Sequence, residues 1–88
     1  MTRESDIEAA ITQYAEVHGW WQCKFTSPSF RGVPDRIFIR KGRHVFIELK
    51  APGETASPQQ QKRHREMRMH GAEVYVVDSI EEGYAVLR

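Results

Sequence analysis

The feature that most constrains the fold is a pair of apolar segments, residues 36–40 and 44–50, separated by a short polar turn. Both segments are rich in β-branched and aromatic residues, which are typical of strands. Lys41 and Gly42 form a two-residue connection of the kind that joins antiparallel strands. The sequence therefore predicts a β-hairpin, and the alternation of side chains along its strands decides which residues share a face.

The register of this hairpin brings two carboxylates to the open end of the strands. With a two-residue turn, Arg40 faces Arg43, and counting outward along both strands places Asp35 directly opposite Glu48. Cross-strand neighbours have Cβ atoms about 5 Å apart, close enough for both side chains to hold one cation. A three-residue turn would make the pair diagonal, which still permits contact. Side chains alternate along a strand, so Lys50 is expected on the same face as Glu48.

The segment before the hairpin is expected to form a helix, a strand and a loop. Ser5 and Glu8 have the spacing of a capping box, and apolar residues follow at helical intervals until Gly19, where the helix should end. Residues 20–25 are rich in β-forming side chains and predict a strand. Residues 26–33 contain a proline and a glycine, which indicates a loop.

After the hairpin, the chain predicts a loop at residues 51–56 and a helix with Ser57 as its N-cap and Gly71 just past its end. Residues 73–77 predict a strand, and Ser79 begins a last short helix with another capping-box pattern. The order is α-β-β-β-α-β-α. Because the last strand–helix–strand unit should be parallel and the hairpin is antiparallel, we expect an α/β fold with a mixed β-sheet flanked by helices.

Length and composition limit the chain to a single small domain. Its 88 residues are too few for two independent cores, so we expect one domain over residues 1–88. With 40% hydrophobic and 28% charged residues, it matches folded globular domains. The one cysteine, Cys23, excludes an intrachain disulfide and a cysteine-based zinc site. No apolar run approaches the roughly 18 residues of a membrane span, and the N-terminus is too polar for a signal peptide. We therefore expect an intracellular protein with no membrane partner.

Asp35, Glu48 and Lys50 together have the chemistry of metal-dependent phosphodiester hydrolysis. Two adjacent carboxylates repel each other, and a divalent cation such as Mg²⁺ removes that repulsion. A metal-bound water can attack a phosphodiester, and an ammonium group can orient this water or offset the charge that grows on the phosphate oxygens. The alternative is a surface salt bridge between one carboxylate and Lys50 on a solvated strand face. Phe46 shares this face, which indicates that it is partly covered.

Three motifs occur in order along the chain, at residues 32–36 (GVPDR), 46–53 (FIELKAPG) and 57–60 (SPQQ). Together they resemble the VRR-NUC family (virus-type replication and repair nucleases), a branch of the nuclease superfamily named for its P-D…(D/E)-x-K motif. The resemblance runs from about Ser5 to the C-terminal helix, and the short chain is similar to phage and prophage members. It implies a restriction-endonuclease-like core and a nuclease that depends on Mg²⁺ or Mn²⁺.

The resemblance also implies a set of site residues. Asp35 and Glu48 match the metal-binding carboxylates of the family, and Lys50 matches its catalytic lysine. The backbone carbonyl of Leu49, between them, is expected to reach the metal as well.

Two further residues match the family but have a structural alternative. Glu8 matches the acidic residue of the first helix that completes the metal site in many members, and Gln60 matches the glutamine of the S-x-x-Q segment. Each lies three residues after a serine, Ser5 or Ser57, and could close a capping box instead. The two roles need not exclude each other.

Basic side chains near these motifs are candidate nucleic-acid contacts. Arg31 and Arg36 flank Asp35, which places them near the scissile strand. The second helix has few apolar positions, and its basic residues either bind phosphates or only add solubility. These residues are Lys62, Arg63, Arg65 and Arg68. His64 and His70 lie six residues apart and off a common helical face, so a histidine metal site is not expected.

The function that these features predict is a metal-dependent endonuclease of DNA. The alternatives are a non-catalytic nucleic-acid binding module of the same fold, and a restriction-type or RNA-directed nuclease that uses the same site. The phage members that the chain resembles are dimeric and suited to four-way junctions, so the resemblance implies a homodimer that cuts branched DNA such as Holliday junctions. One of the adjacent tryptophans is expected in the core. Candidate interface residues are Trp20 or Trp21, Phe30 and Tyr84.

Overall fold

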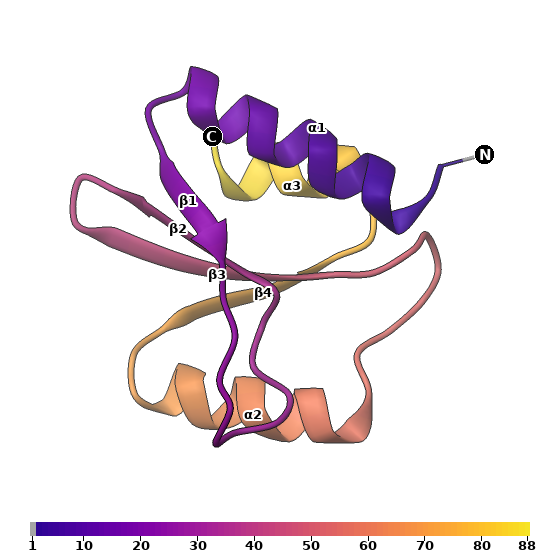
Figure 1. Ribbon diagram of the computed structural model, residues 1–88, viewed down its shortest axis with the longest axis vertical. Coiled ribbons are helices and arrows are strands. Elements are labelled where there is room, and N and C mark those ends of the chain that lie inside the picture. The colour runs from indigo at the N-terminus through magenta and orange to yellow at the C-terminus, as the bar shows by residue number, and fades with distance from the viewer. Residues whose placement is uncertain (1) are drawn as a thin grey trace.

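Four strands form one mixed sheet in the described part of the chain, residues 2–88 (Figure 1). In the computed structural model they lie side by side in the order β1 (Trp21–Lys24), β2 (Arg36–Arg40), β3 (Arg43–Leu49) and β4 (Glu73–Val77). The first three pair antiparallel, whereas β3 and β4 are parallel. The predicted mixed sheet and the element order α-β-β-β-α-β-α are confirmed. β1 is one residue shorter at each end than expected, and β3 is shifted by one residue toward the turn.

The hairpin between β2 and β3 has the predicted two-residue turn. Arg40 pairs with Arg43, and the ladder continues in this register to the start of β2. Both turn residues have positive φ (50° and 83°), as the tight turns that join antiparallel strands require. One step beyond the start of β2, the same register places Asp35 opposite Glu48.

Three helices of the described chain cover the two faces of the sheet: α1 (Glu4–Val17), α2 (Pro58–Met69) and α3 (Ile80–Val86). Helices α1 and α3 lie together on one face, and α2 lies on the other (Figure 1). The chain passes from β3 to β4 through α2, a crossover long enough to make the two strands parallel. Within residues 2–88, no helix is both long enough and apolar enough to cross a membrane.

The apolar core lies between the sheet and the helices α1 and α3. Its buried members are Ile7, Ile11, Ala15, Trp20, Phe38, Val45, Ile47, Leu49, Val77 and Leu87. The helices approach so closely that a Cβ atom at Gly83 would lie 2.3 Å from Cγ2 of Ile11. Trp20 is buried, and its indole N–H donates to the carbonyl of Leu87 at 3.0 Å, whereas Trp21 is 60% exposed. The expectation that one of the two tryptophans is a core residue is confirmed.

The predicted capping box of Ser5 and Glu8 is wrong. Helix α1 begins before Ser5, and a carboxylate oxygen of Asp6 accepts a hydrogen bond from the backbone N–H of Arg3 at 2.9 Å. The helix begins earlier because Asp6 lies three residues after Arg3, the spacing at which a side chain can reach back to cap the first turn. Glu8 therefore has no capping role and is available to the candidate site.

Candidate active site

Asp35 lies directly before β2, beside the end of β3. Its Oδ2 accepts a hydrogen bond from the backbone N–H of Leu49 at 2.8 Å. Its carbonyl oxygen accepts another from the N–H of Phe25, also at 2.8 Å. The preceding Pro34 is buried, and its ring restricts the backbone that enters Asp35. These contacts hold the carboxylate where β3 ends, in agreement with its predicted position opposite Glu48.

Glu48 lies beneath α2 and is only 2% exposed. Nε2 of Gln60 donates to Oε2 of Glu48 at 3.2 Å, and Nε2 of His64 lies 3.5 Å from Oε1. Gln60 and His64 are four residues apart, which places them on one face of the helix. Oε1 of Glu48 and Nε2 of His64 have no hydrogen-bond partner among the described residues. The interpretation of Glu48 as part of a solvated surface salt bridge is therefore wrong.

Gln60 has two structural roles at once. Its backbone N–H donates to Oγ of Ser57 at 3.1 Å, and its Oε1 accepts from the backbone N–H of Ser57 at 2.9 Å, which confirms the predicted capping box. The amide nitrogen of the same side chain is the donor to Glu48. A glutamine amide carries an acceptor and two donor hydrogens, so the two contacts are compatible. Capping holds the side chain in the position from which it contacts Glu48.

The surroundings of Glu48 disfavour its ionised form. Burial raises the pKa of Glu48 to about 8, and the hydrogen bond and negative charge of Asp35 act in the same direction. The charge of Lys50 opposes them and lowers the same pKa. Burial also lowers the pKa of His64, and the charge of Arg68 adds to this effect. Without a cation at neutral pH, Glu48 is largely protonated and His64 is neutral, so the two do not form an ion pair.

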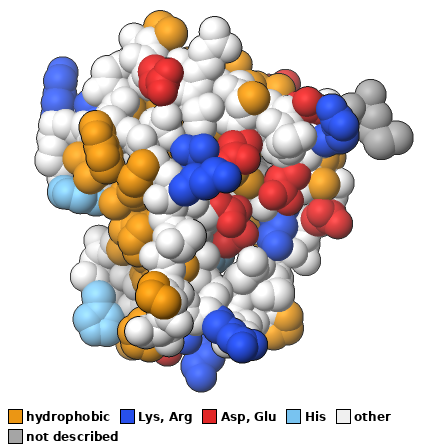
Figure 2. Space-filling model, in the orientation of Figure 1, with side chains coloured by type: hydrophobic (Ala, Val, Ile, Leu, Met, Phe, Trp, Pro, Cys, Tyr) orange, Lys and Arg blue, Asp and Glu red, His pale blue; other side chains and the backbone are white. Residues whose placement is uncertain are grey.

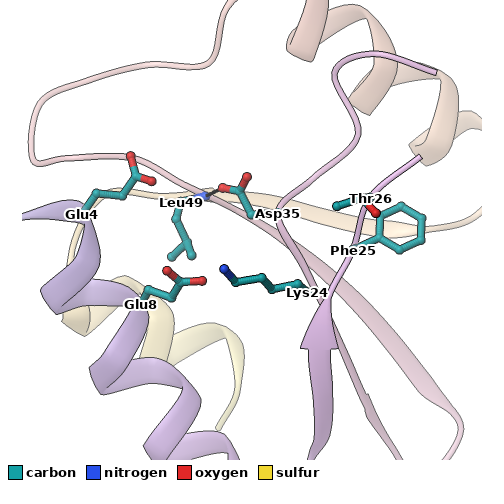
Figure 3. Close-up of a pocket in the computed structure, with 7 residues that line it drawn as sticks. All are labelled: Glu4, Glu8, Lys24, Phe25, Thr26, Asp35 and Leu49. Atoms are coloured by element: carbon teal, nitrogen blue, oxygen red, sulfur yellow. Dashed lines mark hydrogen bonds between the residues drawn. The ribbon is translucent and has the colours of Figure 1, made fainter. Parts of the chain in front are cut away.

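An open pocket of about 240 Å³ lies between the start of α1, the end of β1 and Asp35 (Figure 3). Glu4 and Glu8 reach it from α1, and Lys24 reaches it from β1 (Figure 3). The expectation from the family that Glu8 lies at the site agrees with this arrangement. No site role was predicted for Glu4, which precedes the predicted start of the helix, or for Lys24, which lies outside the three motifs although the resemblance to the family includes it.

Glu8 is held in this pocket by Arg36. Nε of Arg36 donates to Oε2 of Glu8 at 2.7 Å, and the Arg36 side chain is 14% exposed. The same guanidinium donates to the side-chain oxygen of Gln22 on β1. The structure therefore places Arg36 as the partner of Glu8, and the expected contact of Arg36 with the scissile strand stays a prediction.

The donor set suits a hard divalent cation that is held by few protein ligands. Among residues 2–88, no three His, Cys, Asp or Glu side chains are grouped as a metal site. Asp35 and Glu48 nevertheless form a pair, in which Oε1 of Glu48 is buried without a partner and burial, together with Asp35, raises the pKa of Glu48. Mg²⁺ commonly keeps several waters when one or two carboxylates bind it. The pair therefore fits Mg²⁺ or Mn²⁺, with Leu49 and Glu8 as the further ligands that the family suggests.

Two of the arginines of α2, Arg63 and Arg68, bond to other parts of the chain, although Arg68 is also exposed. Arg63 donates to the carbonyl of Arg31 at 2.9 Å. Arg68 donates twice to a backbone carbonyl of β4, at 3.0 and 2.8 Å, and so ties α2 to the sheet. Lys62 and Arg65 are exposed, as is Arg31 in the loop before β2. Figure 2 shows Lys and Arg side chains at the lower end of the molecule, below a group of acidic side chains.

Comparisons with known proteins agree on the fold and on the kind of enzyme. No protein-family model matches the chain. The chain is 39% identical over 80 residues to "Putative nuclease p44" of Acyrthosiphon pisum secondary endosymbiont phage 1. The aligned residues cover 90% of this chain and 86% of that protein. A solved structure described as "VRR_NUC domain" superposes with a TM-score of 0.88 at 25% identity, over 99% of this chain and 96% of that one. A second solved structure, described as "VRR_NUC domain protein", superposes with a TM-score of 0.82 at 18% identity, over 98% of this chain and 85% of that one. At this identity it supports the fold alone.

Proposed function

The chain belongs to the VRR-NUC family of nucleases, and we propose that it is a metal-dependent endonuclease that hydrolyses phosphodiester bonds of DNA. The observation that carries this proposal is the pairing of Asp35 with the buried Glu48 at the end of β3. Two carboxyl groups placed together in a desolvated position are unfavourable unless a cation or a proton compensates them. Lys50 follows β3 directly and would bring an ammonium group to the same end of the strand.

Each residue of the site has a separate task in this proposal. Asp35, Glu48 and the carbonyl of Leu49 would hold Mg²⁺ or Mn²⁺, which when bound supplies an acidified water and positive charge beside the phosphate. The N–H of Leu49 orients the Asp35 carboxylate. Gln60 of α2 donates a hydrogen bond to the Glu48 carboxyl group, and the His64 ring packs beside it. Lys50 orients the attacking water or offsets the charge that develops on the phosphate oxygens.

The remaining polar residues would bind the DNA strand around this centre. Glu8 completes the acidic side of the pocket and is oriented by Arg36. The exposed cations Arg31, Lys62 and Arg65 would contact phosphates beyond the scissile one. Binding of DNA should therefore weaken steeply as the salt concentration rises.

The test is cleavage of end-labelled duplex, flap, single-stranded and four-way-junction DNA with Mg²⁺, Mn²⁺ or EDTA. We expect cleavage only with a metal, and we expect Asp35→Ala to abolish it. The control Glu81→Ala removes an exposed carboxylate from α3 and should cleave like the wild type. Activity in EDTA would contradict the mechanism, and binding without cleavage in any metal would favour the non-catalytic binding module.

We further propose a homodimer that prefers four-way junctions. Trp21 is 60% exposed and pairs with Ile39, and Ile37 lies beside them on the same face. Helix α2 packs against β4, so no described helix covers this face at β1 and β2. Figure 2 shows hydrophobic side chains in a strip on the left of this view.

A second copy of the chain would cover this surface. A two-fold dimer supplies two active sites, and a four-way junction has matching symmetry. Two of the expected interface residues are excluded from this surface, because Trp20 is buried in the core and the Tyr84 ring stacks on Tyr14 of α1. Of the two candidates that remain, Trp21 lies on this surface and Phe30 lies in the loop that follows β1, so the dimer proposal depends on Trp21.

A further inference from the structure

A second hollow, of about 350 Å³, lies between the loop that follows β1 and helix α2. Its walls are largely apolar and include Phe25, Phe30, Val33 and Met67, and Arg63 also lines it. We call these five residues the aromatic hollow. The catalytic roles proposed above make no use of it.

The aromatic hollow shares a wall with the pocket that contains the carboxylates. Phe25 lines both, and its backbone N–H donates to the carbonyl of Asp35 at 2.8 Å. In Figure 3 the Phe25 ring points away from Glu8 and Lys24. A DNA strand with a phosphate at Asp35 therefore has a neighbouring nucleotide beside the aromatic hollow.

The ring of Phe30 offers a stacking surface in this hollow. Phe30 is 56% exposed, and the guanidinium of Arg63 lies 4.4 Å from the centre of its ring. Arg63 is itself held by its bond to the carbonyl of Arg31 and by an ion pair with Glu66. Nucleobases stack on aromatic rings and guanidinium planes largely without regard to base identity. An exposed phenylalanine that is backed by a fixed arginine suits this contact.

Charge and size favour a nucleobase over a second copy of the chain as the occupant. The exposed Arg31 follows Phe30 directly in the chain and would meet the backbone of a bound strand, and Arg63 forms an ion pair with Glu66 of the lining. A concave hollow of about 350 Å³ suits one planar ring system. A stable protein interface needs a much larger surface, on the order of 800 Å² on each partner.

We propose that the aromatic hollow binds an unstacked nucleobase of the nucleotide next to the scissile phosphodiester, with the base against Phe30. This inference rests on the proposed nuclease function. A base inside continuous duplex is already stacked and paired, and removing it from the stack costs free energy. The hollow therefore favours DNA in which a branch or a single-stranded arm has already freed a base beside the cleavage position.

The experiment combines protein variants with DNA from which single bases are missing. The cleavage position is first mapped on a four-way junction, and abasic analogues are then placed one at a time in the flanking nucleotides. We expect Phe30→Ala to lower kcat/KM on the intact junction by about tenfold, the scale of one base–aromatic stack. Phe30→Tyr keeps a ring and should match the wild type. Met69→Ala, which truncates an 84% exposed side chain of α2 outside the hollow, should also match it.

An abasic analogue at one position should lower the cleavage rate of the wild type by a similar factor. On that DNA, Phe30→Ala should cleave as fast as the wild type, because the two changes remove the same contact. If the loss from Phe30→Ala is the same at every abasic position, or if there is no loss, the base subsite is refuted while the nuclease function stands. If the wild type cleaves no DNA with Mg²⁺ or Mn²⁺, the proposed function fails and the subsite with it. Photocrosslinking of wild-type protein to 5-iododeoxyuridine at that position should label Phe25 or Phe30, and labelling elsewhere would refute the subsite independently of any variant.

Discussion

Replacement of Glu48 by glutamine should stabilise the metal-free protein, and more strongly at pH 8 than at pH 5. Glu48 is 2% exposed, and its pKa is raised from the ordinary 4.5 to about 8 in the folded protein. Between these two values, the folded protein binds a proton that the unfolded chain releases. Stability therefore falls as the pH rises through this window, by at most about 1.4 kcal/mol per pH unit.

The expected size of the effect follows from the two pKa values. From pH 5 to pH 8, they correspond to a loss of about 3 kcal/mol in the free energy of unfolding. Below pH 4.5 the group is protonated in both states and imposes no penalty, and above pH 8 the full penalty persists. His64 acts in the opposite sense, because its lowered pKa removes stability as the pH falls below 6.5. It is present in both proteins, so its contribution largely cancels in their difference.

Urea unfolding in EDTA, followed by tryptophan fluorescence, measures this difference. Glu48→Gln should gain about 3 kcal/mol more over the wild type at pH 8 than at pH 5. Glu81→Gln replaces an exposed carboxylate of α3 and should show no such change with pH. Added Mg²⁺ at pH 8 should stabilise the wild type but not Glu48→Gln. An equal difference between wild type and Glu48→Gln at both pH values would refute the reasoning that burial and Asp35 disfavour the ionised carboxylate.

Three further predictions concern the rate, the assembly and the packing. Lys50→Ala should lower the maximal cleavage rate by roughly tenfold or more, because the ammonium acts on water or transition-state charge. The Mg²⁺ concentration that gives half of the maximal rate should change little. A raised half-maximal Mg²⁺ concentration at an unchanged maximal rate would contradict this role. Trp21→Ser should shift the sedimenting mass from a dimer to one chain of 10.2 kDa, whereas Val17→Ser, at a 76% exposed position of α1, should not. A wild type that sediments as one chain would rule out the dimer. Gly83→Ala should lower the free energy of unfolding, measured with urea, by about 1 kcal/mol. Overpacking against Ile11 costs about 1–3 kcal/mol, and the higher helix propensity of alanine offsets about 1 kcal/mol of this cost. Unchanged stability would show that Ile11 can move aside.

The hairpin and its register could be predicted because local sequence decides both. Lys41 and Gly42 take the positive φ values of a two-residue turn, and the pairing then follows by counting along the strands. The ends of α2 were predictable for the same reason. Ser57 caps its first turn through side-chain hydrogen bonds, and Gly71 follows its end with φ of 95°.

The burial of Glu48 could not be predicted from the strand that contains it. The side chain is covered by α2, a helix from later in the chain whose polar composition indicates an exposed position. The available signal was the spacing of Gln60 and His64, four residues apart on one helical face, but spacing does not show what that face covers. The capping pattern at Ser5 gave a wrong helix start for a related reason. Asp6 competes for the same N-terminal donors, and the structure contains its contact instead.

Polar contacts attach α2 to the rest of the protein. Among the residues of α2, all of which the structure describes, His64 is the buried one, and it lies against Glu48. Arg63 bonds to the carbonyl of Arg31, and Arg68 bonds to the backbone of β4. Because so little apolar surface holds the helix, these directional contacts decide where it lies. The contacts that place α2 include the hydrogen bond from Gln60 to Glu48, so docking of this helix buries and orients the carboxyl group that the hairpin register places opposite Asp35.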